Sequence, residues 1–286
     1  MKVSLIQMNS QPDRARNLEE VERLMLQAVT LDRPDLIVLP EHFDWTGGTA
    51  AEKRKAADHV PGGLAYQLVQ RFAAQHGVWV HAGSLLEAVV GRERIFNTTV
   101  VFDHQGREVG AYRKIHLFDI TAPDGKRYAE SETVAPGRQL LIYQMGGLRI
   151  ACCICYDLRF SRLFDRLATE HVDVFILPAA FTRQTGADHW EVLCRARAIE
   201  FQAYVVACGQ CGSYPTPSGE SRQTHGHSLV CDPWGKVVAG MDDGVGVLTV
   251  ALEKERLDAV RRLIPMTEHR VALHGSEVRV AGLVAD

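Results

Sequence analysis

The segment LRIACCICYDLRF, from Leu148 to Phe160, joins an apolar, strand-like run to the start of an amphipathic stretch. The run reaches Cys155, and helix-like spacing of apolar residues follows over residues 159–170. A strand that leads into a helix in this way is typical of layered α/β folds, whose ligands collect at the carboxyl ends of strands. The segment therefore predicts an α/β fold and places a thiol at a candidate site.

On the N-terminal side of this segment, short apolar runs alternate with amphipathic stretches. This pattern predicts helices that cover a sheet, because each element must bury its apolar face against another layer. Two runs joined by the turn at residues 104–107 predict an antiparallel hairpin, so the sheets are expected to be mixed. The expected strands span residues 3–8, 35–40, 78–82, 95–103 and 108–115, and the expected helices span residues 17–31 and 64–76.

On the C-terminal side, the pattern continues almost to the end of the chain. The expected strands span residues 140–143, 148–154, 172–177, 203–208, 227–232 and 237–239, and the longest expected helix spans residues 188–202. The stretch 117–138 is rich in Pro, Gly and charge and is expected to be irregular, as functional loops often are. No linker divides the chain, which predicts a single domain over residues 1–286 with a C-terminal tail from about residue 265.

The bulk composition points to a small-molecule partner. With 46% apolar residues and a formal net charge of -3 spread over both signs, the 286-residue chain has no strong field for nucleic acid or a membrane surface. Neither a signal-peptide pattern nor a membrane-spanning apolar run is present, so a cytoplasmic location is expected. The seven cysteines are expected to be free thiols. No histidine pair has the spacing of a zinc site, so no metal and no cofactor are expected.

Three strand ends carry reactive side chains. Glu41 follows an apolar strand, where partial burial would raise its pKa and suit a general base. Arg113 and Lys114 end another strand, and only one can face a pocket, where an ammonium would stabilise an oxyanion. The position of Cys155 near a helix N-terminus would lower its pKa. Taken alone, the Glu41 and Lys114 segments fit an ordinary structural role better than a catalytic one, and Cys155 fits both equally.

Taken together, the segments resemble the nitrilase superfamily of carbon-nitrogen hydrolases, whose catalytic residues are Glu, Lys and Cys in that order. The resemblance covers nearly the whole chain and extends most closely to the omega-amidase and deaminated-glutathione-amidase branch. The matching motifs are Leu39-Pro40-Glu41, Tyr112 to Leu117, Cys155 to Phe160, Thr185 to Trp190, Arg195 to Glu200 and Gly226 to Gly235.

The resemblance implies a four-layer α-β-β-α sandwich that forms dimers or larger assemblies through a helix-bearing face near residues 188–202. It also implies hydrolysis of an amide of a small carboxylated substrate to acid and ammonia through a Cys155 thioester. Glu41 and Lys114 would complete the triad, and a second glutamate would orient the lysine. Glu130 is the match for that glutamate, with Glu132 as the alternative.

Substrate contacts are expected from three residues. Tyr156 would supply a backbone N–H to the oxyanion, and Phe181 would form a pocket wall. Arg183 could bind a substrate carboxylate, because a guanidinium matches its geometry, although a solvated loop arginine fits the sequence as well. Asp157 and Arg159 are expected to fix the turn after Cys155 through hydrogen bonds.

Two alternatives remain at the level of sequence. A nitrilase or an N-carbamoyl amidase would share the same triad, so the motifs do not separate these substrates. A binding or scaffold protein of the same fold would have lost catalysis, but all three reactive side chains are present.

Overall fold

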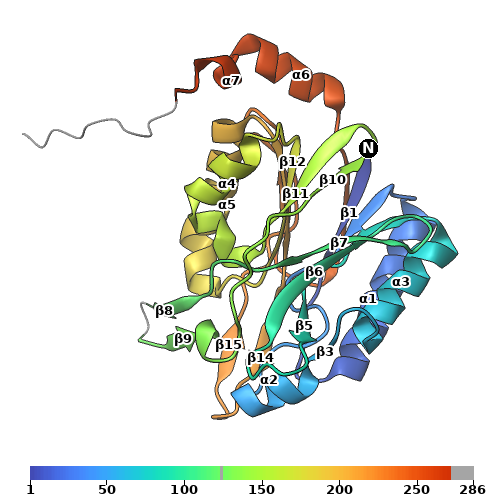
Figure 1. The fold of residues 1–286 in the computed structure, drawn as a ribbon, viewed down its shortest axis with the longest axis vertical. Coiled ribbons are helices and arrows are strands. Elements are labelled where there is room, and N and C mark those ends of the chain that lie inside the picture. The colour runs from blue at the N-terminus through green and yellow to red at the C-terminus, as the bar shows by residue number, and fades with distance from the viewer. Residues whose placement is uncertain (123–124, 272–286) are drawn as a thin grey trace, which may run out of the picture.

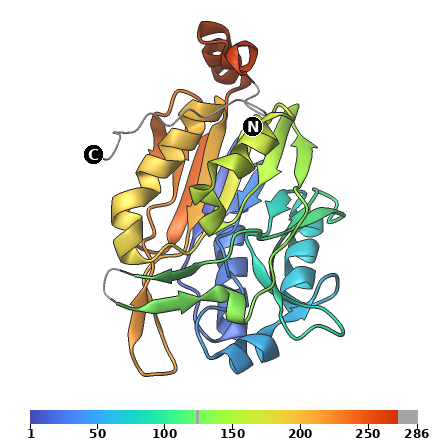
Figure 2. The ribbon, with the colours of Figure 1, turned by 60° about the vertical axis from the view of Figure 1, so that its left-hand side comes forward.

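The computed structural model describes residues 1–122 and 125–271. Two large β-sheets pack face to face, and helices cover both outer faces, so the layers run helix, sheet, sheet, helix (Figure 1, Figure 2). Both sheets contain parallel and antiparallel pairs. The structure therefore confirms the predicted α-β-β-α sandwich with mixed sheets.

The first sheet has eight strands in the order β18-β1-β2-β4-β6-β5-β3, and β7 pairs with β6. The pairs β1–β2 and β2–β4 are parallel, which brings the carboxyl ends of these strands to one edge. The strands are β1 (Lys2–Gln7), β2 (Leu36–Val38), β3 (Asp58–His59), β4 (Trp79–His81), β5 (Leu85–Ala88), β6 (Phe96–Phe102), β7 (Glu108–Arg113) and β18 (Gly246–Ala251).

The second sheet has six strands in the order β10-β11-β12-β13-β16-β17. Its strands β11 to β13 are parallel, β10 and β16 are antiparallel to their neighbours among these three, and β17 is antiparallel to β16. The strands are β10 (Ile142–Met145), β11 (Leu148–Cys152), β12 (Val174–Ala179), β13 (Tyr204–Gly209), β16 (Leu229–Cys231) and β17 (Val237–Gly240).

The apolar core lies in separate layers because side chains alternate along each strand. Leu36 and Val38 point toward the second sheet, whereas Ile37 between them points toward the helices. Helices α1 (Arg14–Leu31) and α3 (Leu64–His76) cover the first sheet, and α4 (Ser161–Ala168) and α5 (Arg183–Phe201) cover the second (Figure 1). Strands β2 and β12 are buried at every position and carry only apolar residues, whereas the equally buried β6 also carries Asn97, Thr98 and Thr99.

Helix α1 illustrates how the sequence sets these elements. Asp13 caps its first turn by accepting a hydrogen bond from the Arg16 backbone N–H, and its buried residues recur every three to four positions. Helix α3 ends where Gly77 adopts a left-handed φ of 61°, which is accessible to glycine without strain. Local signals therefore fix both helices near the bounds expected from sequence.

Helix α5 is longer than expected, because it begins at Arg183 and not at residue 188. Thr182 caps its first turn, and Gly186 lies within that turn. A Cβ at Gly186 would lie 2.3 Å from the His225 side chain, so the glycine permits close packing between these segments. The predicted start at residue 188 was therefore five residues too late.

Several short elements gather at one end of the sandwich, the lower end in Figure 1. The stretch 117–138 was expected to be irregular, but it contains a hairpin and a short 3-10 helix. The elements are α2 (Ala50–Ala56), β8 (Asp119–Thr121), β9 (Arg127–Ala129), the 3-10 helix Glu130–Glu132, β14 (Ser213–Pro215) and β15 (Ser221–Gln223). They surround the carboxyl ends of the central strands.

The opposite end of the molecule carries α6 (Lys254–Leu263) and α7 (Met266–His269) (Figure 1). Helix α7 falls in the predicted C-terminal tail, and residues 272–286 of that tail lie outside the described residues. Within the described ranges, no helix is both long and apolar enough to cross a bilayer. All seven cysteines are buried free thiols.

Candidate active site

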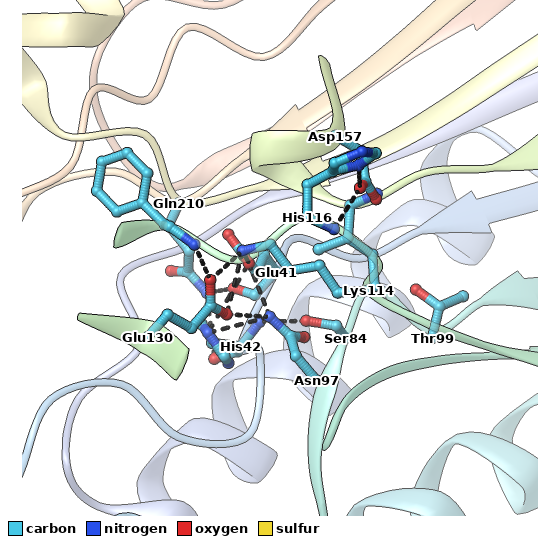
Figure 3. A network of polar contacts seen from close by, with 12 residues as sticks. Glu41, His42, Ser84, Asn97, Thr99, Lys114, His116, Glu130, Asp157 and Gln210 are labelled. Atoms are coloured by element: carbon cyan, nitrogen blue, oxygen red, sulfur yellow. Dashed lines mark hydrogen bonds and ion pairs between the residues drawn. The ribbon is translucent and has the colours of Figure 1, made fainter. Parts of the chain in front are cut away.

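Three strand ends converge on one cavity. Glu41 follows β2, Lys114 follows β7, and Cys155 follows β11 as the first residue of a 3-10 helix (Cys155–Arg159). The Lys114 ammonium lies 2.9 Å from Glu41 Oε1, and the same carboxylate is near enough to the Cys155 thiol that each group shifts the pKa of the other. Residues 41, 114 and 155 thus line one cavity, as the sequence predicted, although they come from both sheets. Figure 3 shows Glu41 and Lys114 side by side.

The alternation of side chains along β7 decides which cation enters the cavity. Lys114 is 2% exposed and faces Glu41, whereas Arg113 points the other way and pairs with Glu87. The Arg113 guanidinium also lies over the Phe96 ring, 4.2 Å from its centroid. As expected, only one of the two cations faces the cavity, and this cation is Lys114.

A second carboxylate and an amide complete the network. Glu130, in the 3-10 helix after β9, places Oε2 at 2.8 Å and Oε1 at 3.1 Å from Lys114 Nζ. Glu132 instead pairs with Arg127 at the surface, so the geometry separates the two candidate glutamates. Asn97 in β6 donates from Nδ2 to Glu41 Oε1 at 2.8 Å and to Glu130 Oε1 at 3.3 Å (Figure 3). One amide therefore contacts both acids.

The turn that presents Cys155 is held by a buried carboxylate. Cys155 has a φ of 46°, a left-handed conformation that costs a non-glycine residue energy. Asp157 accepts hydrogen bonds from the Ile154 backbone N–H and the Tyr112 hydroxyl through Oδ2. Its Oδ1 accepts from the His116 backbone N–H. Asp157 thus fixes the turn, as predicted, and ties the Cys155 turn to the segment after Lys114.

Arg159 does not share that structural role. Its guanidinium lies on the cavity wall, 5.3 Å from the centroid of the Phe181 ring and 3.2 Å from His189 Nδ1. The expectation that an Asp157–Arg159 contact fixes the turn was therefore wrong for the arginine, because the turn directs the two side chains to different surroundings.

Charge and burial set the protonation states, and they correct two expectations. Burial alone would raise the pKa of Glu41, but the nearby Lys114 ammonium outweighs it and holds the pKa at about 2. Burial raises the pKa of the Cys155 thiol well above its usual value, and the Glu41 carboxylate adds to this. A raised pKa for Glu41 and a lowered one for Cys155 were expected from sequence. The resting site instead holds a carboxylate and a neutral thiol.

Burial also acts on Lys114 and His42. It favours the neutral amine of Lys114, but Glu130 and Glu41 together keep the pKa of this group well above its usual value. The pKa of His42 is lowered, chiefly by burial, so its imidazole is neutral near pH 7. Lys114 is therefore the charged cation at the centre of the site.

The cavity has a volume of about 540 Å³, which is large enough for a small organic substrate. Tyr156 and Phe181 line it, as predicted. Arg183 does not line it, because the first turn of α5 directs its side chain to solvent, where it is 65% exposed and pairs with Asp243. The proposed contact between Arg183 and a substrate carboxylate is therefore not carried forward.

Sequence reasoning missed other residues around the site. Asn97 is a buried amide in a strand that ends in the apolar run Val100–Phe102, a signal that could have been noticed. Gln210 donates from Nε2 to the Glu41 carbonyl oxygen at 3.0 Å and so fixes the backbone of the acid. Lys53 and Arg222 line the cavity from α2 and β15, and no local pattern indicated their position.

A metal ion would have to compete with Lys114. Glu41, His42 and Glu130 offer ligand atoms within 4.8 Å of one another. However, the Lys114 ammonium contacts both carboxylates at 2.8 to 2.9 Å and already supplies the positive charge between them. These residues therefore fit an ion-paired lysine better than a divalent cation.

Asn97→Ala is expected to lower kcat/KM for amide hydrolysis about 10- to 100-fold, the value of a hydrogen bond to a charged group. Removing a donor to the Glu41 carboxylate raises its pKa, so the acid limb of the pH profile should move to higher pH. Thr98→Ala is the control, because Thr98 faces away and donates to Glu87. Equal pH profiles for the wild type and Asn97→Ala would contradict this positioning role.

Comparison with known proteins agrees with this geometry. A family model described as carbon-nitrogen hydrolase matches residues 2–262. The deaminated glutathione amidase of Synechocystis sp. is 37% identical over 93% of this chain and 96% of that protein. The omega-amidase NIT3 of Saccharomyces cerevisiae is 31% identical over 94% of this chain and 93% of that protein.

A solved structure supports the same conclusion. The NitFhit protein of C. elegans superposes with a TM-score of 0.86 at 32% identity and covers 94% of this chain. The match spans only 64% of the longer NitFhit chain. The sequence motifs, the four-layer fold and these similarities agree, and the chain belongs to the carbon-nitrogen hydrolase family.

Proposed function

We propose that this protein is an amidase that cleaves a non-peptide amide of a small carboxylated substrate to the acid and ammonia. Cys155 is the nucleophile, Glu41 the general base, and Lys114 the oxyanion-stabilising cation, while Glu130 orients Lys114. One observation carries the proposal: the Glu41 carboxylate pairs with the Lys114 ammonium in the same cavity that the Cys155 thiol lines. The names of the similar amidases support the same reaction class.

In the first half of the reaction, the Cys155 sulfur attacks the amide carbonyl carbon while its proton moves to Glu41. Lys114 and the Tyr156 backbone N–H stabilise the oxyanion that forms. When the carbon-nitrogen bond breaks, the nitrogen takes the proton from Glu41 and leaves as ammonia. A thioester on Cys155 remains, and Glu41 is again a carboxylate.

In the second half, a water molecule gives a proton to Glu41 and attacks the thioester carbonyl. The tetrahedral intermediate collapses, the carbon-sulfur bond breaks, and the proton returns to the sulfur. This releases the carboxylic acid and restores the thiol. Glu41 thus acts first as base and then as acid in each half.

The resting protonation states support a coupled proton transfer. Since Glu41 has a low pKa and the thiol a high one, a free thiolate is disfavoured before substrate binds. The negative charge moves from Glu41 to the oxyanion as the proton moves and the carbon-sulfur bond forms. Lys114 remains close to that charge throughout, so the barrier is lowered without a stable thiolate.

Aromatic side chains shape the substrate wall. Tyr156 contacts Phe118 edge to face with ring centroids 5.1 Å apart, and Phe181 packs on Trp190 at 4.9 Å. Rings held in this way give a rigid apolar surface on one side of the cavity. We propose that the carbon chain of the substrate lies against Tyr156 and Phe181.

Purified protein is expected to release ammonia from alpha-ketoglutaramate or deaminated glutathione faster than from N-carbamoyl amino acids or simple nitriles. Rapid quench with a slowly hydrolysed amide should leave one acyl group on Cys155, detected by mass spectrometry of peptides. An acyl group found only on Cys152 or Cys208 would move the site elsewhere. Preferred hydrolysis of nitriles or carbamoyl compounds would change the substrate class but not the triad.

Three broader expectations remain proposals. We propose a single catalytic domain over residues 1–286, a cytoplasmic location and a homodimer. Three exposed apolar side chains support the dimer. Val192 and Ile199 lie on α5, and Trp234 lies in the turn between β16 and β17. Sedimentation velocity tests the assembly directly.

A further inference from the structure

The wall of the cavity carries more positive charge than its carboxylates neutralise. Among the described residues that line it, the cations are Lys53, Lys114, Arg127, Arg159 and Arg222, and the carboxylates are Glu41, Glu130 and Glu132. Lys114 is paired with Glu41 and Glu130, and Arg127 is paired with Glu132. The other three cations have no described carboxylate within 4 Å. The cavity is therefore suited to an anionic ligand.

Lys53 is one of these three cations, and its helix is locked in place. Thr49 and Glu52 form a capping box at the N-terminus of α2, with hydrogen bonds of 2.7 and 3.1 Å between side chain and backbone. Burial lowers the pKa of Lys53, and the positive charge of Arg222 acts in the same direction against the attraction of Glu130. The helix thus holds an ammonium where an added negative charge would stabilise it.

Arg222 is the second cation, and it reaches the same region from a segment far away in sequence. In the hairpin of β14 and β15 it is directly opposite Tyr214, to which it is hydrogen bonded. Its guanidinium also lies over the Tyr128 ring, 4.3 Å from the centroid. An aromatic ring and a hydroxyl orient the group but leave its charge uncompensated, which suits binding of a carboxylate.

Arg159, the third cation, differs from these two. It stacks near the Phe181 and Tyr156 rings and contacts His189, so it belongs to the aromatic wall beside Cys155. Lys53 and Arg222 instead line the cavity from α2 and the β14–β15 hairpin, and the positive charge of Arg222 adds to the burial that lowers the pKa of Lys53. Two neighbouring cations in a partly buried site have the charge needed to bind one carboxylate.

We propose that Lys53 and Arg222 form a subsite that binds a carboxylate of the amide substrate and so select anionic over uncharged amides. This inference rests on the proposed amidase function and assigns its substrate selectivity to two residues. A carboxylate between the two groups would neutralise charge that the protein itself leaves unpaired. It would also hold the scissile carbonyl at a fixed distance from Cys155, because both lie in one cavity.

Matched amides test the subsite. Glutaramate and valeramide have the same chain length, but only glutaramate carries a carboxylate. The wild type is expected to prefer glutaramate in kcat/KM, and Lys53→Met or Arg222→Met should reduce this preference about 10- to 100-fold, chiefly through KM. Lys53→Arg should restore most of the preference. Lys55→Met removes the same charge from an exposed position on α2 and should leave the preference unchanged.

A binding measurement separates this inference from the proposed function. Calorimetric titration of the Cys155→Ala protein with glutarate reports the subsite without any chemistry. We expect binding that weakens about 10- to 100-fold when Lys53→Met is added. Hydrolysis of both amides without a preference, or equal losses for both in the two variants, would overturn the subsite and leave the amidase function standing. Glutarate binding without ammonia release from any amide would overturn the amidase function alone.

Discussion

Cys155→Ala is expected to abolish amide hydrolysis, with kcat reduced by at least ~10⁴-fold, while the fold is retained. Without sulfur, no thioester can form, and neither Glu41 nor Lys114 supplies another nucleophile. The side chain that is lost is small and buried, so unfolding free energy should change by only about 1 kcal/mol. Ammonia release and thermal unfolding of the same preparation measure the two effects. Cys155→Ser should be similarly inactive.

Cys152→Ala is the matched control. This residue lies three positions earlier on β11, is fully buried, and belongs to the core between the sheets. Burial raises the pKa of its thiol, and among the residues that the structure describes no acid or cation acts on it. We expect turnover within a few-fold of the wild type. Wild-type hydrolysis by Cys155→Ala, or loss of hydrolysis in a folded Cys152→Ala protein, would refute the assignment of the nucleophile.

Lys114→Met is expected to reduce kcat by at least ~10³-fold, because it removes the cation that faces the developing oxyanion. It should also destabilise the fold by about 3–5 kcal/mol, since Glu41 and Glu130 would remain close together without their shared counterion. Methionine fills much of the volume of lysine, so the change tests charge more than packing. Denaturant unfolding and steady-state kinetics measure the two effects.

The contribution of Glu41 to the free energy of unfolding should depend on pH in opposite directions in the wild type and in Lys114→Met. In the wild type, the pKa of Glu41 is lowered to about 2, so its contribution is present above the unfolded value of 4.5 and is lost as pH falls through about 2. In Lys114→Met, burial and Glu130 would instead raise the pKa of Glu41. The variant should therefore become more stable as pH falls and should lose that stability as pH rises.

Arg113→Met is the control for Lys114→Met. Arg113 ends the same strand but faces the opposite side, where it pairs with the buried Glu87. Its loss should cost stability without a comparable loss of kcat. If Lys114→Met retained wild-type kcat, or if both variants lost activity to the same degree, the role of Lys114 in catalysis would be wrong.

Local sequence signals predicted most of the fold. Asp13 caps the start of α1, and Gly77 ends α3. Both act through backbone and side-chain geometry that involves only neighbouring residues. The apolar strands were recognisable because their burial on both faces requires continuous apolar residues. The start of α5 was predicted five residues too late, and the packing of its first turn, where Gly186 lies against His225, is a contact between segments distant in sequence.

The sequence by itself determined the layered architecture and the reactive residue types at three strand ends, because these depend on periodicity and on the order of motifs along the chain. The tertiary structure alone decided their protonation states, since a buried carboxylate 2.9 Å from an ammonium responds to that charge more than to burial. It also excluded Arg183 from the cavity and brought in Lys53 and Arg222. The physical reason is that electrostatic interactions depend on distance in space, which local sequence patterns do not specify.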